Sequence, residues 1–146
     1  MRERARTFLL VLIFLLTAGC GAKDVNQAGQ GVPTEPPLVN SPWQLLSLEE
    51  LPLPVSGREH LLFKEDGTLT GSGGCNRLRS RYEIKGEKLT VKPGATTRRA
   101  CPDMSVERSF FQALTQVDGY RIRGQRLELL GSGKLLLLFQ LGEGLP

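Results

Sequence analysis

Three cysteines are the side chains in this sequence that are best suited to covalent chemistry. Cys20 ends the stretch LTAGC, Cys75 lies in GSGGCNRLRSRYEI, and Cys101 lies in TTRRACPD. A catalytic thiol needs a base, usually a histidine, that takes its proton or lowers its pKa. The chain has one histidine, His60, and no sequence pattern places it beside Cys75. Cys75 could belong to a phosphate-binding loop, act as a nucleophile, or form a structural cross-link at a tight turn, and we favour the cross-link.

Two glycine-rich segments do not fit a phosphate-binding loop. Residues 71–74 (GSGG) follow one predicted strand and precede another, so no helix N-terminus faces a bound anion there. Residues 131–134 (GSGK) lack the Walker A pattern, which needs a glycine five residues before Gly133 and a Ser or Thr after the lysine. Those two positions hold Glu128 and Leu135. We interpret both segments as turns, in which glycine lets the chain reverse sharply.

The first 20 residues predict a lipoprotein signal. Three arginines precede an apolar run over residues 8–16, which has the length of a signal-peptide core and is too short to span a membrane. The ending LTAGC resembles the lipobox of bacterial lipoproteins, in which the cysteine sulfur receives a diacylglycerol before cleavage. We expect residues 1–19 to be a signal peptide and Cys20 to be the acylated first residue of the mature chain. The alternative is an ordinary secretory signal with an incidental cysteine.

Acylation of Cys20 predicts a membrane location outside the cytoplasm. Each buried CH₂ contributes roughly 0.8 kcal/mol, so two or three acyl chains hold a protein stably at a membrane. Gly21 is not the aspartate associated with inner-membrane retention, which favours an outer-membrane protein that faces the periplasm. Removal of residues 1–19 lowers the formal net charge from +4 to about +2, because three basic residues and one acidic residue leave. Nucleic acid is therefore not an expected partner.

The mature chain divides into a tether and one small domain. Residues 20–40 are rich in proline and glycine and have almost no large apolar side chains, which is typical of a flexible segment. Residues 41–146 are dominated by alternating apolar and polar positions, which predict β-strands. The expected strands cover residues 43–48, 60–63, 68–71, 77–84, 88–92, 120–123, 126–130 and 135–140.

One segment of this domain has a helical period instead. Apolar residues recur every three or four positions over residues 104–117, with Asp103 or Ser105 as the expected N-cap. The predicted fold class is α+β: a strongly curved, barrel-like antiparallel sheet of about seven or eight strands with one packed α-helix. We expect this domain to be a monomer.

If Cys20 is acylated, two cysteines remain in an oxidising compartment. There Cys75 and Cys101 favour a disulfide, and the alternatives are a reduced structural pair or a reactive thiol. A disulfide would close a loop of about 26 residues and stabilise the domain by about 3.5 kcal/mol in loop-entropy terms. It also requires that the two Cα atoms lie within about 7 Å of one another.

A group of arginines is the second candidate site. The alternation of residues 77–84 places three arginines on one strand face, and two more come shortly before Cys101. The five are Arg77, Arg79, Arg81, Arg98 and Arg99. Joined by the disulfide, they could bind lipid headgroup phosphates, lipopolysaccharide or an acidic protein surface through bidentate contacts. The alternative is an ordinary solvated strand face with interspersed glutamates.

Several segments together resemble the META domain, a bacterial family that includes a heat-inducible novobiocin-resistance-associated protein. The segments that carry the resemblance are SPWQLLSL, LLFKEDGTLTGSGGCNRLRSRYEI, ATTRRACPD, FFQAL and YRIRGQRLELL, which together span most of residues 41–140. The most specific motifs are Gly74-Cys75-Asn76 and Thr96-Thr97-x-x-Ala100-Cys101. The chain departs from the family pattern at Leu78, Ser80 and Arg99, where an aromatic residue, a glycine and a methionine are usual.

The resemblance implies a small antiparallel β structure with one packed helix and no established catalytic activity. We therefore expect a non-enzymatic cell-envelope lipoprotein that supports envelope integrity or stress tolerance by contacting another envelope component. The alternative is a module that binds a small ligand or an anionic lipid through its curved sheet and arginine face. We expect no catalytic residue, no cofactor and no metal site, and we interpret His60 as an ordinary strand residue.

Overall fold

The computed structural model describes residues 35–48 and 56–144. The predicted signal peptide, the acylation site Cys20 and most of the predicted tether lie outside these residues. The described elements are β1 (Pro42–Leu48), β2 (Glu59–Phe63), β3 (Thr68–Gly73), β4 (Arg77–Lys85), β5 (Lys88–Val91), β6 (Ala95–Thr96), α1 (Ser105–Leu114), β7 (Gly119–Arg123), β8 (Arg126–Gly131) and β9 (Lys134–Leu141).

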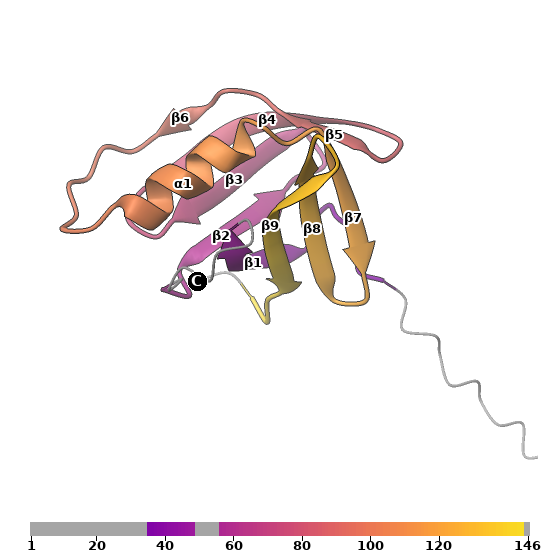
Figure 1. The fold of residues 1–146 in the computed structure, drawn as a ribbon, viewed down its shortest axis with the longest axis horizontal. Coiled ribbons are helices and arrows are strands. Elements are labelled where there is room, and N and C mark those ends of the chain that lie inside the picture. Colours follow the sequence, from indigo (N-terminus) through magenta and orange to yellow (C-terminus); the bar gives the residue numbers. More distant parts are fainter. Residues whose placement is uncertain (1–34, 49–55, 145–146) are drawn as a thin grey trace, which may run out of the picture. The chain divides into compact units, whose positions relative to one another are not determined.

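The strands form one antiparallel sheet that curls into an almost closed barrel (Figure 1). Its order is β5-β4-β3-β2-β1-β9-β8-β7, and β6 pairs with β4 beside this path. The two ends of the sheet meet, because the Leu89 amide donates to the Asp118 carbonyl at 3.3 Å and the Tyr120 amide donates to the Glu87 carbonyl at 3.1 Å. The predicted barrel-like antiparallel sheet with one packed helix is confirmed.

Large apolar side chains fill the inside of this curved sheet. The alternation of β4 shows how: Leu78, Ser80 and Tyr82 are buried, whereas the arginines between them are exposed. The same period in the other strands supplies a continuous core, whose largest fully buried side chains are Trp43, Phe63, Phe110, Phe139, Leu45, Leu61, Leu69, Leu89, Leu127, Leu129 and Leu137. These side chains fill the space inside the curved sheet.

Helix α1 packs its apolar face on this core. Phe110, Ala113 and Leu114 are buried, and the Phe110 ring lies 6.2 Å from that of Phe139. The helix is shorter than predicted: its N-cap is Met104, which makes no side-chain cap bond, and its last residue is Leu114. Among the described residues, no helix is both long enough and apolar enough to cross a membrane.

The segment before β1 belongs to the packed structure. Leu38 is buried, its carbonyl accepts a hydrogen bond from the Trp43 indole at 3.0 Å, and Val39 forms a β-bridge with Phe63. The packed structure therefore includes residues before Ser41, the residue at which the sequence predicted that the domain begins. Composition misses this because two apolar residues among prolines leave no periodic pattern.

The glycines of residues 71–74 do not all serve the turn. Gly74 has a φ of +103°, a conformation that favours glycine, and lies in the β3–β4 turn. Gly71 and Gly73 lie inside β3, where the need is space: a Cβ on Gly71 would sit 2.3 Å from the His60 carbonyl oxygen of β2, and one on Gly73 would sit 2.6 Å from Cγ of Glu107. The interpretation of all three as turn residues is wrong for these two.

We predict that Gly71→Ala destabilises the domain by about 2–3 kcal/mol, because the new methyl group must push β2 and β3 apart. Gly119→Ala is the matched control, since its Cβ would meet its nearest atom at an ordinary 3.5 Å and Gly119 does not have a positive φ. Urea unfolding of both variants measures the difference. Equal unfolding midpoints for Gly71→Ala and the wild type would show that the close strand contact is not a constraint.

Candidate functional site

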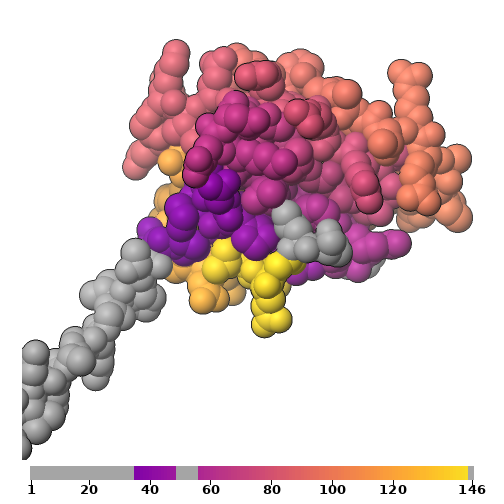
Figure 2. Space-filling view, turned by 180° about the vertical axis from the view of Figure 1, so that it is seen from behind, coloured from indigo at the N-terminus to yellow at the C-terminus, as the bar shows by residue number. Residues whose placement is uncertain are grey.

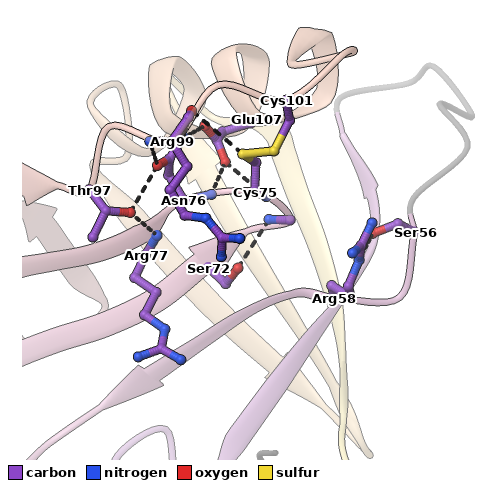
Figure 3. The surroundings of a disulfide bond; sticks show 11 residues. Ser56, Arg58, Ser72, Cys75, Asn76, Arg77, Thr97, Arg99, Cys101 and Glu107 are labelled. Atoms are coloured by element: carbon purple, nitrogen blue, oxygen red, sulfur yellow. Dashed lines mark hydrogen bonds between the residues drawn. A yellow bond between two sulfur atoms is a disulfide. The ribbon is translucent and has the colours of Figure 1, made fainter.

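The two cysteines of the domain form a disulfide beside the β3–β4 turn (Figure 3). The Cα atoms of Cys75 and Cys101 are 6.3 Å apart, and 26 residues separate the cysteines in the sequence. The predicted cross-link is confirmed, and neither sulfur is available as a nucleophile in this state. The bond fastens the segment after β6 to the end of β3.

Asn76, the next residue, is the centre of a buried hydrogen-bond network. Its Oδ1 accepts from the Thr97 hydroxyl at 2.8 Å and from the Arg99 amide at 2.7 Å. Its Nδ2 donates to the Arg99 carbonyl at 3.2 Å and to Oε1 of Glu107 at 2.6 Å. The side chain thus uses its full hydrogen-bonding capacity to connect the β3–β4 turn, the segment after β6 and helix α1.

Glu107 of α1 is the acceptor for the backbone of the same turn. Its Oε2 accepts from the Cys75 amide at 3.1 Å and from the Asn76 amide at 2.5 Å, and the side chain is almost completely buried. A buried carboxylate needs several donors to replace its hydration, and these three N–H groups supply them. Among the described residues, every buried side-chain nitrogen or oxygen has a hydrogen-bond partner.

Sequence reasoning missed Glu107, although a signal for it exists. It stands three residues before Phe110 and seven before Leu114, so it shares their face of the helix. An acidic residue on the buried face of an amphipathic helix indicates a dedicated partner. Its partner lies 31 residues earlier in the chain, which no local pattern reveals.

The start of α1 is held by Asp103. Its Oδ1 accepts from the Ser105 amide at 2.8 Å, and this backbone hydrogen bond holds the pKa of the Asp103 carboxyl below its usual range. Asp103 therefore supports the first turn from one position before the N-cap. The predicted capping role of Asp103 is thus shifted by one residue, and Ser105 is the first helical residue.

The structure divides the five predicted arginines among different surroundings. Arg77, Arg79 and Arg99 line one open groove of about 1200 Å³ on the outer face of the sheet. Arg98 lines a smaller hollow of about 430 Å³ that also contains Met104 and Phe111, and Arg81 lines neither. The larger groove therefore brings three of the five predicted arginines together, and Arg99 also lines the smaller hollow beside Arg98.

The groove contains a fourth arginine that sequence reasoning did not include. Arg58 comes from the segment just before β2, and its Nε donates to the Ser56 hydroxyl at 3.3 Å. Figure 3 shows the side chains of Arg77 and Arg99 extending to the same side of the sheet, with Arg58 across from them. His60 also lines the groove, and its Nδ1 lies 2.9 Å from the Arg58 carbonyl. Because a carbonyl only accepts, this contact assigns the proton to Nδ1 and leaves Nε2 for other partners.

The accessible side chains of the groove are suited to binding. Within the described ranges, no three histidine, cysteine, aspartate or glutamate side chains gather as a metal site. The thiols are joined, and the buried carboxylate of Glu107 is occupied by backbone and amide donors. What remains accessible is a set of guanidinium, imidazole, hydroxyl and amide groups, which recognise anions and polar ligands.

These features define a small, barrel-like β domain with one helix and a disulfide-linked turn. Residues 36–143 match the META domain, and the chain belongs to the META domain family. No curated protein matches the chain.

Solved structures show the same fold. An NMR structure of a protein from Burkholderia xenovorans is 24% identical, with a TM-score of 0.61, and the match covers 73% of this chain and 85% of that one. A crystal structure of a DUF4847 family protein from Bacteroides vulgatus is 16% identical, with a TM-score of 0.55, and the match covers 73% and 96% of the two chains. A further NMR structure is 21% identical with a TM-score of 0.56, over 70% and 89%.

We predict that Glu107→Ala lowers the free energy of unfolding by about 3 kcal/mol or more, because three N–H donors lose their acceptor at once. Glu107→Gln should have a smaller effect, since the amide oxygen still accepts. Glu87→Ala, at an exposed turn position, is the control and should change stability by no more than about 0.5 kcal/mol. Denaturant unfolding of the oxidised proteins gives the comparison. A loss in Glu107→Ala no larger than in the control would contradict the role of this carboxylate.

Proposed function

We propose that this META domain protein is a non-enzymatic lipoprotein of the cell envelope. Acylated Cys20 and the segment that follows it hold the domain at a membrane surface outside the cytoplasm, on the periplasmic side of the outer membrane. There the domain contacts another envelope component and supports envelope integrity or stress tolerance.

The main support for this proposal is that Cys20 lies in a lipobox-like stretch, whereas the other two cysteines form a disulfide. Cys20 closes the lipobox-like stretch LTAGC after an apolar run, and the two remaining cysteines are paired with each other. Disulfides persist in oxidising compartments, so the Cys75–Cys101 bond agrees with export of the chain. The lipobox-like stretch and the disulfide both indicate a location outside the cytoplasm, although they lie in separate parts of the sequence.

The pairing of the two thiols of the described domain supports the non-enzymatic part of the proposal. Covalent catalysis needs an activated nucleophile, and the two thiols of the described domain are consumed by the cross-link. The buried polar groups around Asn76 are satisfied by one another, which is typical of a structural network.

We predict that cells expressing the protein incorporate labelled palmitate into it and that Cys20→Ser abolishes the labelling. The physical reason is that only Cys20 offers a sulfur at the expected cleavage site, whereas the other two sulfurs are bonded to each other. The double variant Cys75→Ser/Cys101→Ser is the matched control, since it removes two cysteines and keeps the acylation site. Gel autoradiography of the immunoprecipitated proteins reads the label.

Two outcomes contradict the lipoprotein proposal. One is a wild-type protein without label, and the other is label that persists in Cys20→Ser. As a second test, separation of inner and outer membranes should place the wild type in the outer membrane, and Gly21→Asp should move it to the inner membrane. Localisation of both proteins to the same fraction would contradict the sorting assignment.

A further inference from the structure

The groove on the outer face of the sheet has the composition of a binding site for a phosphorylated sugar. We propose that it binds a saccharide that carries at least two phosphate groups. Arg58, Arg77, Arg79 and Arg99 supply the positive charge, and the neutral side chains between them supply hydrogen bonds to hydroxyl groups. This inference concerns the domain itself and does not depend on acylation at Cys20.

The strand register explains how the groove floor forms. Arg77 lies opposite Ser72, Ser72 opposite His60, and His60 opposite Gln44, so one row of polar side chains crosses four strands. Directly opposed residues point to the same face of a sheet. Because neighbouring strands lie roughly 4.8 Å apart, this row spans about 14 Å. That width exceeds a single phosphate group and suits a ligand of sugar size or larger.

A second row widens the positive side of the floor. Arg79 lies opposite Thr70 on β3 and opposite Ala95 on β6. Arg77 and Arg79 are both exposed and stand two residues apart on the same face of β4. The space-filling view shows β1, β2 to β4 and the C-terminal residues adjoining on one face of the domain (Figure 2). The residues of these elements line the same groove.

The charge in the groove is one-sided. Among the described residues, no aspartate or glutamate lines it, and the ion pairs join Lys92 to Glu83 and Arg121 to Glu128, away from the groove. Four guanidinium groups that face one hollow repel each other, and a bound anion of at least two charges relieves that repulsion. Guanidinium groups match phosphate geometry with paired N–H bonds, which favours phosphate over a single halide-like charge.

The neutral side chains favour a sugar over a simple polyphosphate. Thr70, Ser72 and Gln44 line the floor. His60 contacts the Arg58 carbonyl through Nδ1, so its Nε2 does not take part in that contact. Hydroxyl, amide and imidazole groups pair with sugar hydroxyls, and a polyphosphate offers no donor for such groups. One wall is rigid, because the Arg99 backbone is bonded to Asn76 through both its amide and its carbonyl. A fixed wall lowers the ordering entropy that binding must overcome.

The test uses the mature chain (residues 20–146) carrying Cys20→Ser, so that no acyl chain contributes to binding. The probes for calorimetry are a glucosamine disaccharide with two phosphate groups, the same disaccharide without phosphate, and inorganic phosphate. Vesicles of phosphatidylglycerol, with and without a phosphorylated glycolipid, distinguish a lipid headgroup from a soluble sugar phosphate.

We expect the bisphosphorylated disaccharide to bind at least tenfold more tightly than either simpler probe, and more weakly as salt concentration rises. Arg77→Gln/Arg79→Gln should weaken this binding at least tenfold. Arg123→Gln/Arg126→Gln is the matched control, because it removes the same charge from the exposed β7–β8 hairpin and should bind like the parent. Neither pair makes a side-chain hydrogen bond within the described residues, and equal thermal unfolding midpoints verify that both variants fold.

Each outcome decides the inference. Amide shifts of Thr70, Ser72 and Arg79 on titration, together with the loss in the groove variant, support it. Additional binding to vesicles that contain the glycolipid assigns the source as a lipid headgroup, and binding of the soluble disaccharide alone assigns a soluble sugar phosphate. No binding by the parent protein, equal losses in both arginine pairs, or equal affinity for inorganic phosphate or plain phosphatidylglycerol vesicles would overturn it. A negative result in this binding test would not affect the proposal that Cys20 is acylated, because palmitate labelling tests that proposal independently.

Discussion

The buried amide of Asn76 and the buried carboxylate of Glu107 hold together three parts of the chain that are distant in sequence. Hydrogen bonds from these two side chains reach the β3–β4 turn, the segment after β6 and helix α1. Each hydrogen bond lost from either buried group would lower the free energy of unfolding by about 1–3 kcal/mol or more. We therefore expect the three parts to fold cooperatively. The adjacent disulfide adds about 3.5 kcal/mol by limiting the unfolded chain.

The groove depends on this network. Strand β6 pairs with β4 through only two residues, Ala95 and Thr96, which is too little to fix the segment after it as a wall by sheet hydrogen bonds alone. The bonds of Asn76 to Thr97 and Arg99, with the cross-link at Cys101, continue the attachment beyond the strand. A structural motif of the interior thereby positions an arginine of the surface, and this connects the stability of the domain to the site that we propose.

The strands and the helix were predictable because their burial follows a simple period. β4 is the clearest example, since its alternating arginines and buried residues appear in both the sequence and the structure. Local patterns could not reveal β6, which has two exposed residues, or the pairing of Glu107 with a turn 31 residues away. The roles of Gly71 and Gly73 were also hidden, because they arise from close approach of β2 and α1. Three of the four groove arginines, Arg77, Arg79 and Arg99, were predicted as parts of a site, whereas the inclusion of Arg58 required the three-dimensional arrangement.

The central claim is that the Asn76 network makes the turn and the segment after β6 part of the cooperative core. Native-state hydrogen exchange of the oxidised protein, followed by NMR, tests it most directly. The amides of Cys75, Asn76 and Arg99 each donate to a side-chain acceptor of this network. We predict that they exchange as slowly as the amides of β1 and β9 and open only on global unfolding. Exchange of these amides at the rate of an exposed loop, while the strands remain protected, would contradict the account.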